Sequence, residues 1–462
     1  ACELPLASGE DAAAAVDRAT AAQRGWAGAS LAERVALVHR FARALQARRE
    51  EIARDITRQM GKPIAQARAE VTTCASRASH MAGIAEETLA DERLPGKPGF
   101  ERFIAREPVG VVLNIAPFNY PLLTAVNVVA PAVLAGNAVV LKHASRTPLC
   151  AGHFARAFHE AGAPGGLVEA LVASHEVVRE VLSRREVALV ALTGSGAAGR
   201  EIHLAAAQRL MPAILELGGK DPAYLAEDVD LDFAVREVIE GAFYNAGQSC
   251  CGVKRIYAHE RIHDSFLEAA LAAAAAFVPG DPSAEATTLG PLATPNAPEA
   301  LEQQLREARS RGARVLCGGE RARVGGKGRF FLPTLVEDVP PGTALANEEV
   351  FGPVALVERV ACDEEALARM NASRFGLSAS IWTRSIDRAL RMGRRLEAGT
   401  VYMNRCDYLD PALPWIGWKQ SGLGLSLSRH GLLAMTRPKS FHLRTAELVS
   451  PGPSGQPVGD GP

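Results

Sequence analysis

Short apolar segments alternate with helical segments from residue 109 onward, and this alternation limits the chain to few architectures. The first series of apolar segments is VGVVLNIAP (109–117), NAVVLK (137–142), VALVALT (187–193) and AILEL (213–217). Helical patterns lie between and after them, near 123–134, 148–162, 174–183 and 197–208. This order is typical of right-handed βαβ units around a parallel sheet.

A second series of apolar segments follows and extends to residue 404. Its members are VKRIYAH (253–259), ARVLCG (313–318), ALVERV (355–360), SASIWT (378–383) and GTVYMN (399–404). Upstream, apolar residues spaced by three and four indicate helices over 11–90. A chain of 462 residues exceeds the usual size of a single core. The fold class is therefore predicted to be α/β, with two Rossmann-like parallel-sheet domains.

Two segments outside these series look like partners in a small hairpin. SFHLR (440–444) is a lone strand pattern, and a terminal strand needs another sheet edge. FERFIAREP (100–108) is the candidate partner, within one subunit or between subunits. We therefore expect oligomerisation strands at 100–108 and 438–446. The tail at 449–462 is rich in Pro and Gly and is expected to be disordered.

Charge and cysteine usage restrict the partners and the compartment. With 51 Lys and Arg against 52 Asp and Glu, the net charge is −1, which disfavours nucleic acid and anionic membrane as partners. The eight cysteines include no CxxC pair, which favours a reduced cytoplasmic protein. The uncharged segment 122–141 is as long as a membrane span, but Asn127, Pro131 and the Gly136–Asn137 turn divide it into a buried helix and a buried strand. No signal-peptide pattern is seen, although a start at Ala1 leaves the natural N-terminus open.

One short motif suggests a metal. His259 to His263 spells HExxH, a zinc-protease motif that requires both imidazoles on one helical face. Here His259 ends a strand pattern and the helical pattern begins only near Asp264. We therefore expect no metal.

A second motif suggests a dinucleotide. Gly194 to Gly199 matches GxGxxG between a strand and a helix, with Glu216 downstream as a candidate ribose ligand. An ordinary tight turn followed by an unrelated acid is the alternative.

The segment YNAGQSCCGVK, from Tyr244 to Lys254, places two adjacent cysteines in a loop between a helical and a strand pattern. Adjacent cysteines are often only small buried side chains. Here, however, the surrounding motifs make the chain resemble the aldehyde dehydrogenase superfamily over nearly its whole length. Those motifs are NAGQSC (245–250), ELGGK (216–220), PFNYP (117–121), the lysine of VVLKHAS (Lys142), TGS (193–195) and EEVFGP (348–353).

The resemblance implies a dinucleotide-binding domain at 1–99 and 109–218 and a catalytic domain at 219–425. It makes Cys250 the nucleophile and reassigns Glu216 as the general base. The amide of Asn119 and the N–H of Cys250 would bind the oxygen of a thiohemiacetal. After hydride transfer to the cofactor, Glu216 would activate the water that hydrolyses the thioester. The alternatives are an acylating enzyme that uses coenzyme A and a non-catalytic dinucleotide-binding protein on the same fold.

The resemblance also implies NAD or NADP as cofactor. The expected cofactor-binding residues are Lys142, Ser145, Gly194, Ser195, Glu349 and Phe351. NAD-selective relatives often carry a glutamate where this chain has Ser145, so a 2′-phosphate would not be repelled and NADP is favoured. The alternative is that Ser145 has no influence on cofactor choice.

The substrate is expected to be a small-molecule aldehyde, whose identity the sequence leaves open. The residues expected to contact it are Phe118, Tyr120, Thr124, Asn127, Ser249, Cys251, Leu409 and Trp415. The loop 404–417 departs from the common family forms. Within it, Arg405 suits an anionic aldehyde and Asp407 and Asp410 a cationic one, but contacts within the loop are favoured for all three. A homodimer or homotetramer is expected.

Overall fold

A computed structural model describes residues 4–445. The chain begins with a helical region, as its apolar spacing predicts. The helices are α1 (Gly9–Trp26), α2 (Leu31–Ala47), α3 (Arg49–Met60), α4 (Ile64–Gly83) and α5 (Ala85–Leu89). Ser8 and Ser30 each form a capping box at the start of a helix, with Asp11 and Glu33 respectively.

The first sheet has six strands in the order β19-β7-β6-β3-β4-β5. Its strands are β3 (Val111–Ala116), β4 (Ala138–His143), β5 (Val168–Ala170), β6 (Val187–Thr193), β7 (Ala213–Glu216) and β19 (Gly422–Leu423). The helices between them are α6 (Pro121–Leu134), α7 (Leu149–Glu160), α8 (His175–Ser183) and α9 (Gly196–Ala207). All pairs are parallel except β19 with β7, which confirms the predicted parallel sheet.

The uncharged segment 122–141 divides as predicted into a buried helix, α6, and a buried strand, β4. Within residues 4–445, no helix combines the length and apolar character needed to cross a bilayer.

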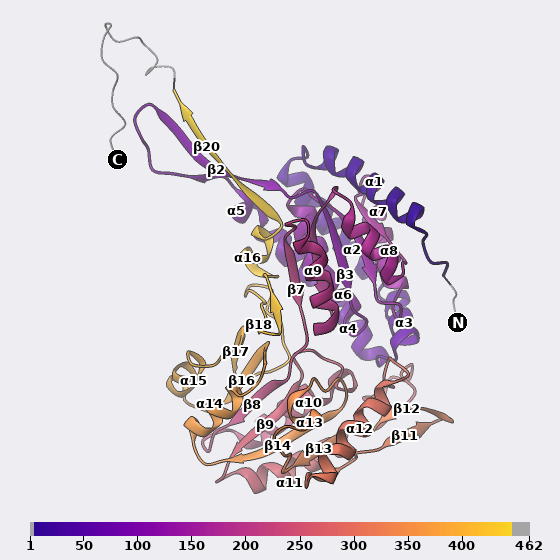
Figure 1. The fold of residues 1–462 in the computed structure, drawn as a ribbon, viewed down its shortest axis with the longest axis vertical. Helices are drawn as coiled ribbons and strands as arrows, with labels where there is room; N and C mark the ends of the chain where they lie inside the picture. Colours follow the sequence, from indigo (N-terminus) through magenta and orange to yellow (C-terminus); the bar gives the residue numbers. More distant parts are fainter. Residues whose placement is uncertain (1–3, 446–462) are drawn as a thin grey trace.

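The second sheet has seven strands in the order β10-β13-β14-β9-β8-β16-β17 (Figure 1). Its strands are β8 (Asp221–Leu225), β9 (Val253–His259), β10 (Arg314–Cys317), β13 (Thr334–Glu337), β14 (Val354–Val360), β16 (Ser378–Trp382) and β17 (Thr400–Met403). The helices of this region are α10 (Leu231–Phe243), α11 (His263–Ala275), α12 (Ala297–Ser310), α13 (Ala344–Asn347), α14 (Asp363–Asn371) and α15 (Ile386–Gly393). The edge strand β10 runs antiparallel to β13, whereas the alternating pattern predicts parallel pairing.

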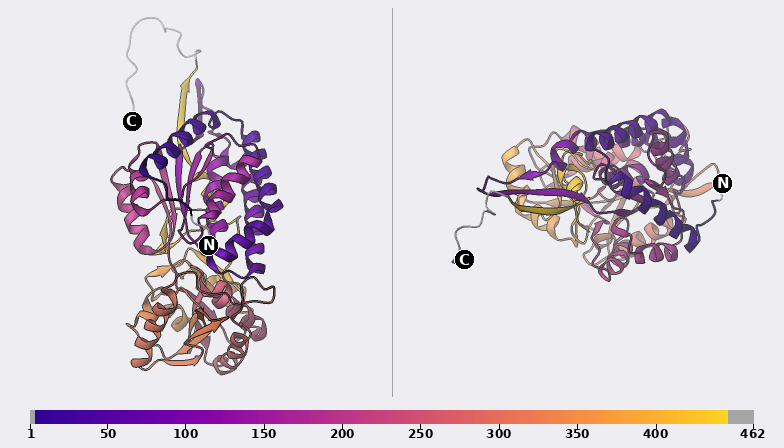
Figure 2. Two further views of the ribbon diagram at one scale, coloured as in Figure 1. Left: turned by 90° about the vertical axis from the view of Figure 1, so that its right-hand side faces the viewer. Right: turned by 90° about the horizontal axis from the view of Figure 1, so that it is seen from above.

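A three-stranded extension projects from the first sheet's side of the molecule (Figures 1 and 2). It contains β1 (Glu92–Arg93), β2 (Phe100–Pro108) and β20 (Thr436–Arg444). β2 and β20 pair antiparallel over their full lengths, and the rings of Phe103 and Phe441 stack with centroids 4.5 Å apart. The predicted pairing of 100–108 with the last strand therefore forms within one chain. Residue 446 and the predicted tail at 449–462 lie outside the described residues.

The remaining elements are short. They are a hairpin of β11 (Arg321–Val324) and β12 (Lys327–Phe331), the pair β15 (Phe375–Gly376) and β18 (Trp418–Lys419), the 3₁₀ turn η1 (Tyr244–Gly247) and α16 (Ser428–Leu433). Because β19 returns to pair with β7, the chain crosses back to the first sheet after completing the second.

Candidate active site

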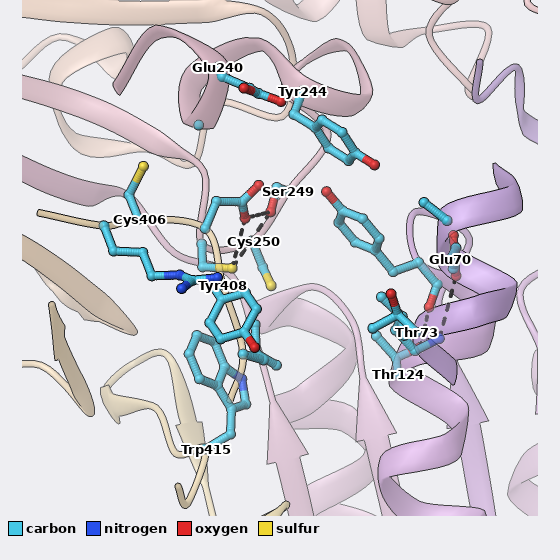
Figure 3. Close-up of a pocket in the computed structure, with 18 of the residues that line it drawn as sticks. Glu70, Thr73, Thr124, Glu240, Tyr244, Ser249, Cys250, Cys406, Tyr408 and Trp415 are labelled. Atoms are coloured by element: carbon cyan, nitrogen blue, oxygen red, sulfur yellow. Dashed lines mark hydrogen bonds between the residues drawn. The ribbon is translucent and has the colours of Figure 1, made fainter. Parts of the chain in front are cut away.

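A cavity of about 560 Å³ is lined by residues from α4, α6 and α10, from the loop around Cys250 and from the loop 404–417 (Figure 3). Cys250 and Glu216 both line it. The substrate residues predicted from sequence that also line it are Tyr120, Thr124, Asn127, Ser249, Cys251, Leu409 and Trp415. Phe118 lies elsewhere, because its ring packs edge-on against Phe351 with centroids 5.9 Å apart.

The nucleophile loop, residues 245–252, has an unusual backbone. Asn245, Ala246 and Gly247 follow one another with φ of 53°, 54° and +66°. Left-handed conformations of non-glycine residues cost free energy and persist only where the surroundings enforce them. At Gly247 a Cβ atom would lie 2.2 Å from the carbonyl oxygen of Gly352, so the NAGQSC and EEVFGP motifs pack backbone against backbone.

Two buried side chains hold this loop in place. Lys254 Nζ donates to the carbonyl oxygens of Gly247 at 2.9 Å and Gly352 at 2.8 Å, which ties the two motifs together. Burial lowers the pKa of Lys254 to about 8. Gln248 Oε1 accepts a hydrogen bond from the backbone N–H of Ala293 at 2.9 Å. The position of Cys250 is thus set by contacts made on both sides of it.

Asn119 lies between β3 and α6 and is fixed against the nucleophile loop. Its Nδ2 donates to the backbone carbonyl oxygen of Gln248 at 3.1 Å. The backbone carbonyl oxygen of Asn119 accepts from Asn245 Nδ2 at 3.0 Å. A side-chain amide has two N–H donors. One orients Asn119, which leaves the other for a ligand.

Glu216 ends β7 and is buried. Burial raises the pKa of its carboxyl group. The hydrogen bond from Ser426, the positive charge of Arg77 and the hydrogen bond from the Thr193 hydroxyl oppose that rise. Ser426 Oγ donates to Glu216 Oε1. Ser426 follows β19, which pairs with β7 in a register that sets Gly422 opposite Glu216. Sequence reasoning missed Ser426, because no local signal links positions so far apart.

The ELGGK motif needs its glycines for close packing. A Cβ atom at Gly219 would lie 2.2 Å from the carbonyl oxygen of Cys250, and one at Gly218 would lie 2.6 Å from the carboxylate oxygens of Glu349. The Gly219 N–H donates to Glu349 Oε1 at 3.3 Å. Burial raises the pKa of Glu349. The motif therefore joins the predicted base, nucleophile and cofactor carboxylate.

The other predicted cofactor residues lie at the ends of β4 and β6. Ser195 caps α9 by accepting from the Ala198 N–H at 3.3 Å, and helix N-termini bind phosphate groups. A Cβ atom at Gly199 would lie 2.5 Å from Leu217, so this glycine packs the helix closely against the sheet. These features fit a dinucleotide.

Lys142 and Ser145 differ in their exposure. Lys142 is buried in β4, and burial lowers its pKa. Ser145 is exposed in the turn before α7, beside Arg146. Both line the region where β4 ends, and Ser145 also borders a second cavity, of about 1290 Å³, which Arg58 and Lys327 line as well.

The loop 404–417 supplies another wall of the cavity. The Arg405 guanidinium lies 3.4 Å from the centroid of the Tyr408 ring, and Asp410 accepts from the Ala412 N–H at 2.9 Å, so these two charges bind within the loop as predicted. Asp407 does not. It accepts from Ser249 Oγ at 2.6 Å and Cys251 Sγ at 3.1 Å, and burial raises its pKa. The prediction of contacts within the loop is therefore wrong for Asp407, which binds the nucleophile loop instead.

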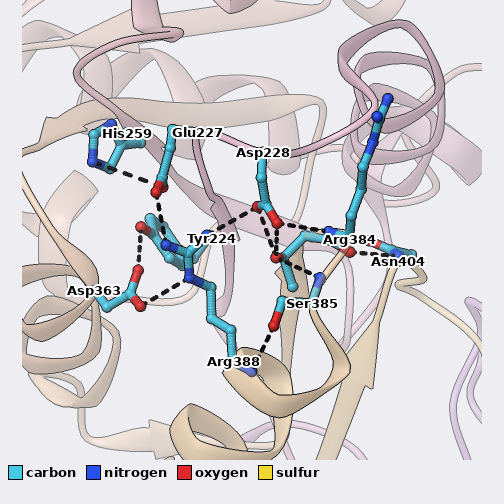
Figure 4. Close-up of polar contacts among 10 residues, drawn as sticks. Tyr224, Glu227, Asp228, His259, Asp363, Arg384, Ser385, Arg388 and Asn404 are labelled. Atoms are coloured by element: carbon cyan, nitrogen blue, oxygen red, sulfur yellow. Dashed lines mark hydrogen bonds and ion pairs between the residues drawn. The ribbon is translucent and has the colours of Figure 1, made fainter.

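A polar network anchors the start of this loop (Figure 4). Asn404 Nδ2 donates to the carbonyl oxygen of Thr383, whose hydroxyl donates to Asp228. Arg388 pairs with Asp228 at 2.9 Å and with Asp363 at 3.0 Å. The rest of the loop has fewer such ties.

A buried ion pair holds the beginning of α6. Lys62 and Glu70 pair with side chains 0% and 2% exposed. Glu70 Oε1 accepts from the Leu122 N–H at 2.9 Å, and Lys62 Nζ lies 4.0 Å from the centroid of the Tyr120 ring. The pair thereby orients the turn that carries Asn119. Sequence reasoning missed it, because both residues read as parts of amphipathic helices.

The two histidines of the HExxH string lie on different elements. His259 ends β9, and His263 begins α11, where it contacts Asp264 at 3.1 Å and Glu337 at 3.0 Å. The two imidazoles do not share a helical face.

Comparison with known proteins shows the family to which the chain belongs. The model of the aldehyde dehydrogenase family matches residues 1–441. A succinate-semialdehyde dehydrogenase [NADP(+)] of Deinococcus radiodurans is 36% identical over 436 residues, which cover 94% of this chain and 91% of the relative.

Solved structures give the same result. An NAD-dependent aldehyde dehydrogenase from Sinorhizobium meliloti matches with a TM-score of 0.92 at 35% identity, over 97% of this chain and 89% of that one. An NADP-dependent enzyme from E. coli matches with a TM-score of 0.91 at 32% identity, over 96% of this chain and 92% of that one.

Proposed function

The chain belongs to the aldehyde dehydrogenase family, and from this premise we propose that Cys250, Asn119 and Glu216 oxidise an aldehyde to a carboxylic acid at the cavity that Cys250 and Glu216 line. As a member of that family the protein is an NAD(P)-dependent oxidoreductase. We assign the dinucleotide to residues 1–99 and 109–218 and the catalytic groups mainly to 219–425.

In the proposed reaction the Cys250 thiolate attacks the aldehyde carbon and forms a thiohemiacetal. The free N–H of Asn119 and the backbone N–H of Cys250 donate to its oxygen, where negative charge develops. NAD(P), which Lys142, Ser195 and Glu349 would hold, would supply the hydride acceptor, and loss of the hydride from the thiohemiacetal carbon would leave a thioester on Cys250. Glu216 then removes a proton from water, and the resulting attack on the thioester carbon releases the acid and frees the thiolate.

One observation supports this assignment most strongly: the nucleophile and the base line one cavity, and the ELGGK and NAGQSC backbones touch at Gly219 and Cys250. Such contact fixes the distance between the reacting groups. The buried carboxylate favours hydrolysis of the thioester over transfer to coenzyme A.

We propose that NADP is the preferred cofactor. Ser145 is exposed and uncharged where an acid would repel a 2′-phosphate, and the cations Lys142 and Arg146 lie beside it in the chain. Gly194 and Ser195 would receive the pyrophosphate at the start of α9, and Glu349 and Phe351 the nicotinamide ribose. The Deinococcus radiodurans relative and the E. coli neighbour are both named as NADP-dependent.

A panel of aldehydes with NAD and NADP tests the reaction, read as the ultraviolet absorbance of the reduced cofactor. Succinate semialdehyde belongs in the panel because the Deinococcus radiodurans relative is named for it. We expect turnover without coenzyme A and none with Cys250→Ala. Turnover that requires coenzyme A would favour the acylating alternative.

The cofactor preference has its own test. Ser145→Glu should lower kcat/KM for NADP relative to NAD, because the new carboxylate repels the 2′-phosphate. An unchanged ratio would show that Ser145 has no influence.

We also propose a homodimer or homotetramer assembled through the β2–β20 extension. β20 is the outer strand of its sheet and is largely exposed, so its edge is open to pairing. Light scattering of the wild type and of Leu443→Lys, which changes an exposed residue of β20, tests this. A cytoplasmic location is proposed as well, because the cysteines that the structure describes are all free.

A further inference from the structure

Arg77 is a buried cation whose hydrogen-bond partners are all neutral. It lies on α4, lines the cavity of Cys250 and is 5% exposed. Its Nη1 donates to Asn127 Oδ1 at 2.9 Å and to the carbonyl oxygen of Leu123 at 3.3 Å, and its Nη2 to that of Leu409 at 3.5 Å. Its Nε is buried without a partner. Across residues 4–445, no acidic side chain forms an ion pair with it.

Such a group is costly for the fold. A buried charge without a counter-ion loses hydration, and an arginine cannot escape by losing its proton. Lys62, also buried, pairs with Glu70. The buried Lys220, Lys254 and Arg255 donate to backbone carbonyl oxygens, and none of the three lines this cavity. Arg77 is therefore the cation in this cavity that is equipped to meet an anion from outside.

Five acids line the cavity: Glu70, Glu216, Glu237, Glu240 and Asp407. Glu216, whose charge opposes the lowering of the Arg77 pKa by burial, accepts from Ser426, and Glu237 pairs with Arg236. Glu70 is neutralised by Lys62, and Asp407 accepts hydrogen bonds from the nucleophile loop. Glu240 is exposed on α10 beside Tyr244, on the other side of the cavity from Glu70 and Thr124 (Figure 3). Solvent screens an exposed carboxylate far more than a buried guanidinium.

Arg405 is the other cation of the lining, and it is less suited to an anion. It is exposed, and its guanidinium already stacks on Tyr408. Arg77, by contrast, is held by Asn127, a neighbour in the same lining. This arrangement fixes the planar guanidinium fork, which matches the geometry of a carboxylate.

We propose that Arg77 binds the carboxylate of aldehydes that carry an acid group at their other end, with Asn127 as the residue that positions Arg77. The inference rests on the proposed function, because it names the substrate class of the same cavity. It assigns the choice of substrate to α4 and α6 rather than to the charged residues of the loop 404–417.

The test compares kcat/KM for aldehydes that differ only at the far end. Succinate and glutarate semialdehydes are anionic, butanal and pentanal are neutral, and 4-aminobutanal is cationic. We expect the wild type to prefer the anionic members over the neutral ones. Arg77→Met should reduce the ratio of anionic to neutral by about 10- to 100-fold, the usual contribution of hydrogen bonds to a charged group. Arg77→Lys, which keeps the charge but loses the fork, should fall between.

Arg405→Met is the matched control, since it removes the other cation of the cavity. In Arg405→Met the ratio of kcat/KM for the anionic aldehydes to kcat/KM for the neutral ones should stay near that of the wild type. A loss as large as that of Arg77→Met would overturn the assignment to Arg77, as would an unchanged ratio in Arg77→Met.

The wild type alone keeps the inference falsifiable if Arg77→Met does not fold. A preference for 4-aminobutanal, or equal use of all end groups, would contradict it. Failure of the wild type to oxidise any aldehyde would instead contradict the proposed function, so the two failures are distinguishable.

Discussion

The nucleophile loop at 245–252 and the loop 404–417 line the same cavity but are held very differently. The first is buried and tied to neighbouring backbone by Lys254 and by the packing of Gly247 on Gly352. The second begins at an anchored residue, Asn404, but carries exposed side chains, with Leu413 55% and Tyr408 38% exposed. The difference separates a wall that holds the proposed reacting groups fixed from a wall of the same cavity that tolerates change.

The largest effect should come from Asn119, whose side chain is hydrogen-bonded to the nucleophile loop. Asn119→Ala should lower kcat by about 10²- to 10³-fold, because it removes a donor to the developing oxyanion. Steady-state kinetics with a saturating aldehyde measures this. Leu413→Ala in the other loop is the control and should change kcat little. Comparable losses in both variants would abolish the distinction between the loops.

A change of backbone in the nucleophile loop should come next. Gly247→Ala places a methyl group against the Gly352 carbonyl at a positive φ, which should displace Cys250 and lower kcat/KM by about 10²-fold. Thermal unfolding should also show a loss of about 1–3 kcal/mol. Gly152→Ala, where the added methyl group meets nothing within 4 Å, is the matched control. If Gly247→Ala behaves like Gly152→Ala, the loop is not rigid.

Ser426→Ala should act through pH. Burial already raises the pKa of Glu216, and the hydrogen bond from Ser426 opposes this rise. Without it the pKa rises further, so the acidic limb of the hydrolysis rate, which requires ionised Glu216, should move to higher pH. The free energy of unfolding also depends on pH through Glu216. Because the folded pKa of Glu216 is raised, the stabilisation from its neutral form is present at low pH and is lost as the pH rises through the folded pKa.

The pH dependence of single-turnover hydrolysis measures the effect of Ser426→Ala. Ser310→Ala, an exposed serine at the end of α12, serves as control. An acidic limb at the same pH in both variants would show that Ser426 does not act on Glu216.

The smallest effect should come from the outer wall. Tyr408→Ala removes a half-exposed ring that Arg405 covers, so it should raise KM for the aldehyde by less than about tenfold and change kcat little, as expected for contacts equal in ground and transition states. A large fall in kcat would show that this loop also orders the reacting groups.

The first sheet could be predicted from sequence because parallel strands buried on both faces are continuous apolar runs. Four strands of the two large sheets escaped for physical reasons. β5, β13 and β19 are only a few residues long, and β8 contains Pro222, which argues against a strand.

The residues of the candidate site also divide into those that the sequence predicts and those that it does not. The resemblance of three short motifs to those of the aldehyde dehydrogenase superfamily predicts Cys250, Glu216 and Asn119 as catalytic residues. Ser426 and Arg77 could not be found, because what matters is their partners: Ser426 meets Glu216 across 210 residues and Arg77 meets Asn127 across 50. Local patterns carry no information about such pairs.

The central claim is that Cys250 forms an acyl intermediate which Glu216 hydrolyses, and trapping that intermediate tests it most directly. Glu216→Gln should be mixed with an aldehyde and oxidised cofactor, then digested and weighed by mass spectrometry. The account predicts a burst of reduced cofactor of about one equivalent per site and an acyl group on the peptide that contains Cys250, with slow turnover afterwards. Undiminished turnover by Glu216→Gln, or a burst with no acyl group on Cys250, would contradict it.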